Sequence, residues 1–454
     1  MFFFKLTALL SKKSVALPAR KYSKKIMNKH TFQNYLFLSL LWICCGCENT
    51  LDGLSLRSDQ NERFYWGNNA AASERVAKIM YNESNGSRSE RFKIVHISDV
   101  HLSSWSPSNH YVLPINLRQS VQFANQPELR INVMAVTGDF ISYGKKSEAK
   151  AYMKSFASSL QQDNFIPYVI CTGNHDSNIG AQEDRSPIMS TLFYKPEITN
   201  LLFTNNQNSY KRIPNENYYY KDFSNPQGGT IRMIALDMID QPSDVYNTLN
   251  YAHYSQEQIN WLSNVALREG MTSSHSVIIL NHYPFQHHDS GASTYLCDGD
   301  YVHPWYMIPE IVEAFRGHTT LTKTYPNQFG GEDIHVDADF TNNTATFICY
   351  LGGHIHANAY FEIKGLSNEQ MNLPKQKMII CTNQAPSEAG TVYNRVKREE
   401  DSLSSNSFCI HAIDTQEHKI YITFFGAFRP EGAKNYPDIQ ELTYYIHLFL
   451  KDNR

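Results

Sequence analysis

The segment that decides the fold is TFICYLGGHIHA, residues 346 to 357. A run of apolar residues, typical of a buried β-strand, ends there in two glycines followed by His354 and His356. Residues i and i+2 of an extended chain lie on the same side, so both imidazoles can point at one site. One such ending carries little weight alone. Its meaning depends on whether other strands end in the same way.

Four other apolar runs also end in residues that can bind metal ions. KIVHIS leads into Asp99 and His101, and INVMAVTG leads into Asp139. YVICTG leads into Asn174, and SVIILN leads into His282. In open α/β sheets, binding sites form just beyond the carboxyl ends of the strands. Strands that end in this way would bring their polar side chains together at one rim.

The side chains at these strand ends form a mixed set of metal donors. The set holds imidazole nitrogens, carboxylate oxygens and one amide oxygen, from Asp99, His101, Asp139, Asn174, His282, His354 and His356. This mixture suits borderline divalent ions such as Zn, Mn or Fe. The donors are too many for one tetrahedral ion, and they fit two ions that share a bridging carboxylate. Each motif alone has an ordinary structural explanation, such as a turn or a buried histidine. Their joint occurrence favours a dinuclear metal site.

Composition and patterning indicate a large layered domain. The chain has 454 residues, of which 42% are hydrophobic, so it can bury a sizeable core. The net charge of −3 gives no broad basic bias, and no nucleic-acid partner is expected. From residue 91 onward, β-branched runs alternate with amphipathic stretches, the pattern of an α/β domain. Helices are predicted at 146–161, 255–270 and 308–316. The runs after residue 357 predict a second, mainly antiparallel sheet.

The N-terminal region predicts export from the cell. The apolar run from Tyr35 to Cys45 is shorter than the roughly 20 residues of a membrane-spanning helix and is typical of a secretory signal peptide. The segment is similar to a bacterial lipoprotein signal, with Cys47 as the lipidated residue, although Cys44 stands where that family prefers Leu, Val or Ile. An ordinary cleaved signal is the alternative. We therefore expect a membrane-anchored lipoprotein, periplasmic or on the cell surface, or otherwise a secreted protein.

The sequence divides into a leader, a tether and one domain. The predicted segments are a signal segment at 1–47, a polar tether at 48–90 and a single domain at 91–454 with insertions near 286–306 and 317–345.

Most of the cysteines beyond the signal segment are predicted to lie in the core. They are scattered, odd in number and without a CxxC pair, which argues against a disulfide scaffold. Those within apolar runs are predicted to be small buried side chains: Cys171, Cys349, Cys381 and Cys409.

As a set, DVH, GD, GNHD, the strand-end His282 and GHIH resemble the motifs of the calcineurin-like metallophosphoesterase superfamily. The resemblance covers roughly residues 91 to 430. It implies an α/β fold in which two mixed β-sheets pack face to face and are flanked by helices. It also implies two divalent metal ions as cofactors, with Mn, Fe and Zn as the candidates.

The resemblance also implies a role for each motif residue. The first ion would be held by Asp99, His101 and His356. The second ion would be held by Asn174, His282 and His354. Asp139 would bridge the two ions. His175 would act as general acid or orient the phosphate, with Asp176 behind it as its partner.

The implied activity is hydrolysis of a phosphoester by in-line attack of a metal-bridging hydroxide. GNHD is more similar to the cyclic-nucleotide and sphingomyelin-type phosphodiesterase branches than to the protein phosphatases. We therefore slightly favour a phosphodiester over a phosphomonoester, in a small or lipid substrate. The loop QHHDSG adds His287, His288 and Asp289, which could contact substrate or form a solvated polar loop.

Two alternative functions remain open at this point. A ligand-binding surface lipoprotein that has lost catalysis would be marked by a missing metal ligand, and none is missing. A nuclease of the same superfamily would be marked by a basic face, which the composition does not indicate.

Overall fold

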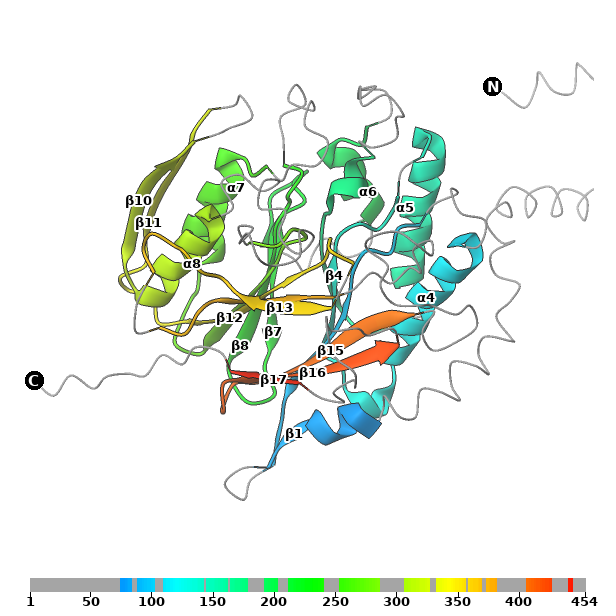
Figure 1. The fold of residues 1–454 in the computed structure, drawn as a ribbon, viewed down its shortest axis with the longest axis horizontal. Coiled ribbons are helices and arrows are strands. Elements are labelled where there is room, and N and C mark those ends of the chain that lie inside the picture. Colours follow the sequence, from blue (N-terminus) through cyan, green and yellow to red (C-terminus); the bar gives the residue numbers. More distant parts are fainter. Residues whose placement is uncertain are drawn as a thin grey trace, which may run out of the picture. The chain divides into compact units, whose positions relative to one another are not determined.

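Two mixed β-sheets form the centre of the fold (Figure 1). In spatial order, the first sheet consists of β17 (Gln440–Thr443), β16 (Lys419–Gly426), β15 (Ser407–Asp414), β3 (Phe92–Ile97), β4 (Val133–Thr137) and β5 (Tyr168–Cys171). β3, β4 and β5 pair in parallel, whereas β15, β16 and β17 pair antiparallel.

The second sheet has a parallel centre between antiparallel edges. In spatial order, it consists of β13 (Ala359–Glu362), β14 (Lys377–Ile380), β12 (Thr346–Gly352), β9 (His275–Leu280), β8 (Thr230–Ala235), β7 (Tyr219–Ser224) and β6 (Lys211–Arg212). The pairs β8–β9, β9–β12 and β12–β14 are parallel. The remaining pairs in this sheet are antiparallel.

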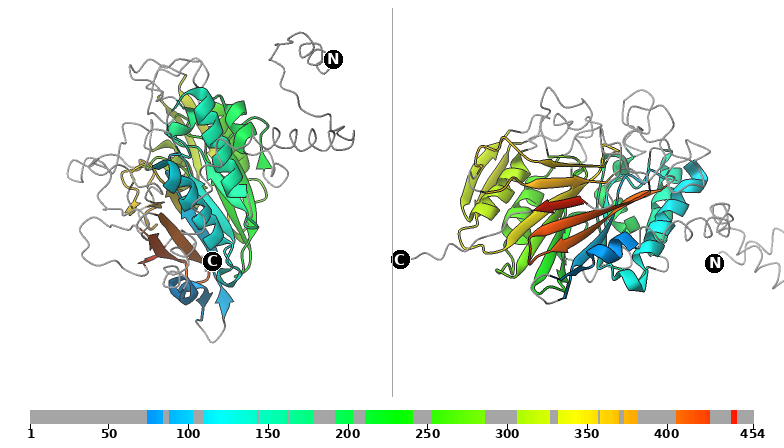
Figure 2. Two further views of the ribbon diagram at one scale, coloured as in Figure 1. Left: turned by 90° about the vertical axis from the view of Figure 1, so that its right-hand side faces the viewer. Right: turned by 60° about the horizontal axis from the view of Figure 1, so that its bottom comes forward.

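Helices cover the outer face of each sheet, as two further views of the ribbon also show (Figure 2). The first sheet packs on α4 (Asn109–Ala124), α5 (Lys146–Gln161) and α6 (Lys195–Leu202). The second sheet packs on α7 (Gln256–Trp261) with its π-helical continuation (Leu262–Ala266), α8 (Met307–Gly317) and the hairpin of β10 (Thr320–Tyr325) and β11 (Ile334–Asp339). Short 3₁₀ helices lie at Pro127–Leu129 and Asn174–Ser177, and β1 (Tyr81–Asn82) pairs with β2 (Ser89–Glu90).

The sequence of β9 shows why the second sheet is buried on both faces. Ile278 and Leu280 belong to the core between the two sheets. Val277 and Ile279 point the other way, into the core under α7 and α8. A strand covered on both faces needs apolar residues at successive positions, which is the composition expected of a parallel strand at the centre of an α/β fold.

The predicted fold class and helices are confirmed. α5 spans 146–161, and α8 includes 308–316. The helix predicted at 255–270 begins at its cap Ser255, where the hydroxyl accepts the backbone N–H of Gln258, but it passes into a π-helical turn and ends at Ala266.

The prediction of a separate antiparallel sheet after residue 357 was wrong. β13 and β14 extend the second sheet, whereas β15, β16 and β17 extend the first. The apolar runs were identified correctly as strands, but local patterning does not reveal which neighbour a strand pairs with.

The computed structural model describes residues 74–83, 88–102, 109–142, 144–161, 164–178, 192–202, 211–240, 253–285, 306–326, 332–356, 358–369, 373–381, 406–426 and 440–443. The chain divides into two units, 1–56 and 57–454, and every described residue belongs to the second. The predicted signal segment with Cys47 and the loop with His287, His288 and Asp289 therefore lie outside the described residues. Within the described part, no helix has the length and apolar character needed to cross a membrane.

Candidate metal centre

The five strands identified in the sequence end at two neighbouring rims. β3, β4 and β5 are adjacent and parallel in the first sheet, so the loops that follow them leave from the same edge. β9 and β12 are adjacent and parallel in the second sheet. Backbone hydrogen bonds join the loops within each rim. Asp99 donates to Gly138 (3.1 Å), and Gly353 donates to His282 (3.0 Å).

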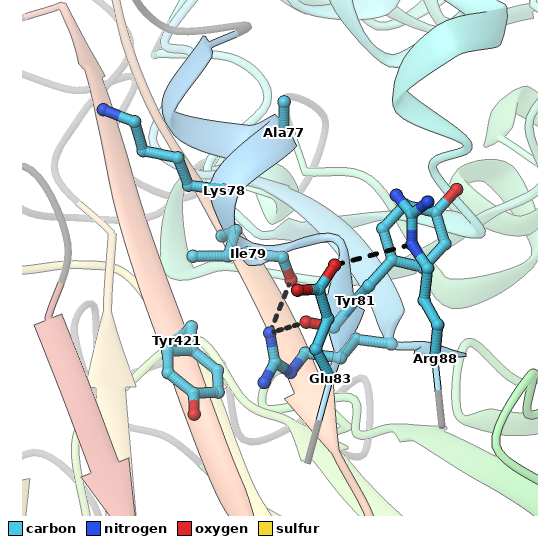
Figure 3. A pocket seen from close by; sticks show the side chains of 8 residues that line it. Ala77, Lys78, Ile79, Tyr81, Glu83, Arg88 and Tyr421 are labelled. Carbon is cyan, nitrogen blue, oxygen red and sulfur yellow. Dashed lines mark hydrogen bonds and ion pairs between the residues drawn. The ribbon is translucent and has the colours of Figure 1, made fainter. Parts of the chain in front are cut away.

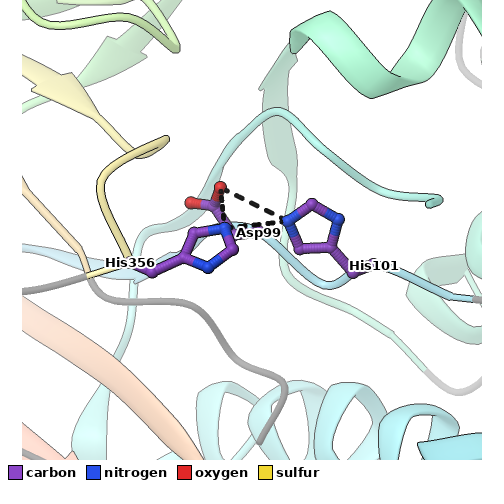
Figure 4. Close-up of side chains that lie close together, drawn as sticks. All are labelled: Asp99, His101 and His356. Atoms are coloured by element: carbon purple, nitrogen blue, oxygen red, sulfur yellow. Dashed lines mark hydrogen bonds and ion pairs between the residues drawn. The ribbon is translucent and has the colours of Figure 1, made fainter. Parts of the chain in front are cut away.

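Asp99, His101 and His356 form the first group of metal donors (Figure 4). Their ligand atoms all lie within 4.8 Å of one another. Nε2 of His356 lies 3.3 Å from Oδ1 of Asp99, and Nε2 of His101 lies 3.7 Å from the same oxygen. The two Nε2 atoms are 2.9 Å apart. This group is the set that the family resemblance assigns to the first ion.

Asp139, His282 and His354 form a second group with the same spacing. Oδ2 of Asp139 lies 3.2 Å from Nε2 of His282. The same oxygen lies 3.6 Å from Nε2 of His101, which belongs to the first group. Asp139 therefore faces both groups, as a bridging carboxylate must.

The surroundings of Asn174 indicate that the site suits a cation. Asn174 follows β5 at the start of the 3₁₀ helix, only 5% of its surface is exposed, and its Oδ1 has no hydrogen-bond partner among the described residues. A buried amide oxygen without a donor costs about 1–3 kcal/mol, which a metal ion would offset. With imidazole, carboxylate and amide donors, the residues fit borderline divalent ions.

Neighbouring backbone and hydroxyl groups orient the donors. Nδ1 of His282 lies 2.6 Å from the carbonyl oxygen of Thr137, so it is the N–H nitrogen and Nε2 is left to bind a metal ion. The Ser98 hydroxyl donates to Oδ2 of Asp99 at 2.6 Å. The backbone N–H of His354 donates to both oxygens of Asp99, at 3.1 and 2.9 Å. No pattern in the sequence marks these residues as partners of the donors.

Opposite charges at the centre shift one another's pKa values. Burial acts to raise the pKa of Asp99, but His282, His101 and His356 hold it well below its usual range. Burial acts to lower the pKa of His282, but Asp139 and Asp99 raise it to about 9. Burial lowers the pKa of His175 to about 3.

Most of the donor residues have a left-handed backbone conformation. The φ angles are positive at Asp99 (51°), His101 (50°), Asp139 (53°), His354 (73°) and His356 (50°). This region costs an L-residue roughly 1–2 kcal/mol, and such residues cluster at functional sites. The loops after β3, β4 and β12 therefore turn sharply at their ligands, at a cost that the surrounding hydrogen bonds must offset.

His175 lies beside the donors, whereas Asp176 connects the loops. Nε2 of His175 is 3.8 Å from Oδ2 of Asp139, and its ring meets the ring of His101 edge to face. The Asp176 carboxylate accepts the backbone N–H groups of Gly173 (2.7 Å), Phe140 (2.8 Å) and Asp139 (3.0 Å). Asp176 therefore holds the loops after β4 and β5 together, a contact different from its predicted place behind His175.

We expect Asp176→Asn to lower the free energy of unfolding by about 3 kcal/mol. The side-chain NH₂ of the new asparagine would face a buried backbone N–H that a carboxylate oxygen of Asp176 now accepts. Urea unfolding in the presence of a chelator measures the change without a contribution from metal binding. Asp337→Asn, the same substitution on the exposed face of β11, is the control. Equal stabilities of the two variants would contradict this role for Asp176.

A separate cavity of about 620 Å³ lies among the helical residues 74–79, the β1–β2 hairpin and β16 (Figure 3). Its lining residues are Ala77, Lys78, Ile79, Tyr81, Glu83, Arg88, Arg91 and Tyr421. None of them belongs to the two donor groups, so this cavity is not part of the candidate metal centre.

Three similar solved structures are distant from this chain in sequence. PhoD matches with 11% identity and a TM-score of 0.40, covering 78% of this chain and 68% of that chain. The purple acid phosphatase PPD1 from yellow lupin (Lupinus luteus) seeds matches with 14% identity and a TM-score of 0.39, covering 78% and 54%. The phosphopantetheinyl hydrolase of Mycobacterium tuberculosis matches with 11% identity and a TM-score of 0.34, covering 64% and 90%. At these low scores the likenesses carry no argument about substrate.

Comparison with sequences gives one family. A search of curated proteins found no match. The model of the calcineurin-like phosphoesterase family matches residues 92–321, half of the chain. His354 and His356 lie beyond the match, and the structure brings them to the same centre. The chain therefore belongs to the calcineurin-like phosphoesterase family, and its clustered donors support metal-dependent hydrolysis of phosphoesters.

Proposed function

We propose that this protein is a phosphodiesterase that works with two divalent metal ions. The observation that carries the proposal is the position of Asp139, whose Oδ2 lies within 3.6 Å of His101 and within 3.2 Å of His282, one from each donor group. A carboxylate that faces two sets of metal donors is the arrangement required for a dinuclear centre.

The residues on either side of Asp139 would divide the ions between them. One ion would be held by Asp99, His101 and His356. The other would be held by Asn174, His282 and His354. When bound, the ions would activate water and neutralise charge on the phosphoryl group. The Ser98 hydroxyl donates a hydrogen bond to Asp99, and the Thr137 carbonyl accepts one from Nδ1–H of His282. These bonds keep the two ligands in place for this task.

His175 is the residue proposed to act on the substrate itself. It is 20% exposed at its side chain, so a substrate beside Asp139 can reach it. We expect His175→Gln to lower kcat/KM for bis-p-nitrophenyl phosphate about 100-fold, the lower end of the range for a group that transfers a proton. The control is His335→Gln on the exposed face of β11.

Substrates with different leaving groups distinguish the two roles of His175. If His175 protonates the leaving alkoxide, the loss in His175→Gln grows with the pKa of the leaving alcohol. If it donates a hydrogen bond to a phosphoryl oxygen, the loss is equal for all leaving groups. A variant as active as the His335→Gln control on every substrate would remove His175 from the mechanism.

The preference for diesters rests on the similarity of GNHD to the phosphodiesterase branches, and it is tested directly by substrate comparison. Protein stripped with chelator should be inactive, and Mn²⁺ should restore hydrolysis of bis-p-nitrophenyl phosphate. We expect a higher kcat/KM for this diester than for p-nitrophenyl phosphate. The reverse order would make the protein a phosphomonoesterase. No hydrolysis of either ester with Mn²⁺, Fe²⁺ or Zn²⁺ would leave a ligand-binding role, and hydrolysis of single-stranded DNA would favour a nuclease.

We further propose that the enzyme is exported and anchored through a lipid on Cys47, with a small or lipid phosphoester as substrate. The apolar run before Cys47 and the polar tether after it support this location. Cells fed labelled palmitate should label the wild-type protein and not Cys47→Ala. Equal labelling, or none in either protein, would contradict the anchor.

A further inference from the structure

A buried hydrogen bond joins the two sheets next to the candidate metal centre. Asp237 follows β8 of the second sheet, and Thr172 follows β5 of the first. The two residues form an isolated parallel bridge, and the Thr172 hydroxyl donates to Oδ1 of Asp237 at 2.5 Å. Asp237 is completely buried, and only 3% of the Thr172 surface is exposed. This contact therefore connects the end of a strand in one sheet to the end of a strand in the other.

The surroundings of Asp237 fix its position. The side chain of Gln258 binds both backbone polar groups of Asp237, accepting from its N–H at 2.8 Å and donating to its carbonyl at 2.9 Å. Oδ2 of Asp237 accepts a hydrogen bond from Nδ2 of Asn217 at 3.1 Å. The orientation of Asn217 is fixed in turn, because its Oδ1 accepts the Thr199 hydroxyl at 2.7 Å. Asp237 is therefore a rigid acceptor for Thr172.

Asp237 also lies at the rim of the second sheet that carries His282. The pairing of β8 with β9 continues through Leu236, whose N–H donates to the Leu280 carbonyl at 3.1 Å. His282 follows Leu280 by two residues. The contact between Asp237 and Thr172 therefore brings the end of β5 to this rim.

The loop after β5 must reach both sheets if Asn174 is to bind an ion. Asn174 follows Thr172 by two residues, on a strand end of the first sheet. His282 and His354, the other residues proposed for the second ion, follow strands of the second sheet. The contacts of Asp176 join the loop to the one after β4, which also belongs to the first sheet. A contact with the second sheet is needed as well.

We propose that Asp237 is a positioning residue for the second metal ion. Through the Thr172 hydroxyl, it holds the loop after β5 against the second sheet. Asn174, whose buried Oδ1 has no partner among the described residues, can then bind the same ion as His282 and His354. This role rests on the dinuclear centre of the proposed function. It adds a residue that lies in none of the ligand motifs.

The first ion should not depend on this contact. Its proposed ligands, Asp99, His101 and His356, lie on the loops after β3 and β12. Loss of the bond between Thr172 and Asp237 should therefore weaken one ion selectively. A general loss of structure would weaken both.

The test is to titrate the full chain, stripped with chelator, with Mn²⁺ in equilibrium dialysis. Thr172→Val keeps the shape of the side chain and removes the hydroxyl. We expect it to bind the second Mn²⁺ about tenfold more weakly, the lower end of the range for groups that orient metal ligands, and the first with unchanged affinity. Thr172→Ser keeps the hydroxyl and should restore the binding of the wild type.

Two further variants make the result specific. Thr423→Val is the matched control, because Thr423 is a buried threonine on β16 whose hydroxyl has no hydrogen-bond partner among the described residues. It should bind both ions as the wild type does. Asp237→Ala should weaken the second ion, and the double variant Thr172→Val/Asp237→Ala should bind it no more weakly than Asp237→Ala alone, because the two side chains form one contact. Unchanged affinity in Thr172→Val, or an equal loss at both sites, would overturn the proposal.

Hydrolysis of bis-p-nitrophenyl phosphate by the same samples separates this proposal from the proposed function. A wild type that binds two Mn²⁺ ions without hydrolysing any phosphoester would contradict the function, while the titration of the variants would still decide the role of Asp237. An active wild type with the same Mn²⁺ binding as Thr172→Val would contradict the positioning role alone. A wild type that binds fewer than two ions would overturn both.

Discussion

Replacing Asp139 with asparagine is expected to reduce kcat/KM for bis-p-nitrophenyl phosphate on the order of 10³-fold. Oδ2 of Asp139 lies 3.6 Å from His101 of the first donor group and 3.2 Å from His282 of the second, and Asn has nearly the same shape without the charge. Metal ions stabilise phosphoryl transfer by several kcal/mol, and about 1.4 kcal/mol corresponds to a tenfold change in rate. The variant should also bind less than two equivalents of Mn²⁺, which metal analysis of the purified protein measures separately from activity.

The stability of Asp139→Asn distinguishes loss of the ions from loss of the fold. Oδ1 of Asp139 accepts the backbone N–H of His175 at 2.9 Å, and an asparagine carbonyl oxygen can keep that bond. We therefore expect the metal-free variant to unfold in urea close to the metal-free wild type. Asp337→Asn serves as the control for the substitution itself. Wild-type activity together with a full complement of metal in Asp139→Asn would show that this carboxylate does not bridge the ions.

The ligand positions could be predicted because of how parallel strands end. Each run of apolar residues in β3, β4, β5, β9 and β12 is followed within three residues by a candidate donor, and parallel neighbours place those residues at the same rim. The pattern does not depend on the details of packing. It was therefore visible from the sequence alone.

Strand partners could not be predicted in the same way. β14 and β15 are both short apolar runs, yet β14 pairs with β12 and β15 pairs with β3. Pairing depends on contacts between residues far apart in the chain, such as Cys409 opposite His96. An apolar run specifies burial, and burial is available in either sheet.

The contacts that hold the ligands in place could not be predicted from the sequence either. Asp176 acts on backbone N–H groups, which every residue except proline carries, so no side-chain pattern marks its partners. The left-handed conformation of Asp99, Asp139 and His354 has a weak local signal, because aspartate and histidine tolerate it better than most residues. Only the fold shows that these positions are turns rather than continuing strand.

Gly173→Ala is expected to have an effect on the centre as large as removal of a ligand. Gly173 has a φ of −111°, which any residue can adopt, so its role is a matter of space alone. A Cβ there would lie 2.3 Å from Oδ1 and 2.4 Å from the backbone N of Asp139. Backbone atoms cannot move aside as the end of a flexible side chain can, so the loop after β4 must shift. We expect a loss of about 3 kcal/mol in the free energy of unfolding, the upper end for overpacking.

The same shift would move the shared carboxylate out of place. A displacement of about 1 Å at a catalytic group can cost on the order of 100-fold in rate, and Asp139 is the residue that faces both donor groups. Gly144→Ala is the matched control, because its Cβ would have no heavy atom nearer than 3.8 Å and the residue lies on the loop after β4, which also carries Asp139. Gly144→Ala should keep the activity and stability of the wild type, while Gly173→Ala should lose both activity and Mn²⁺ binding. If the two alanine variants behave alike, the packing of the loops after β4 and β5 does not fix the position of Asp139. The geometric argument for the dinuclear centre would then fail.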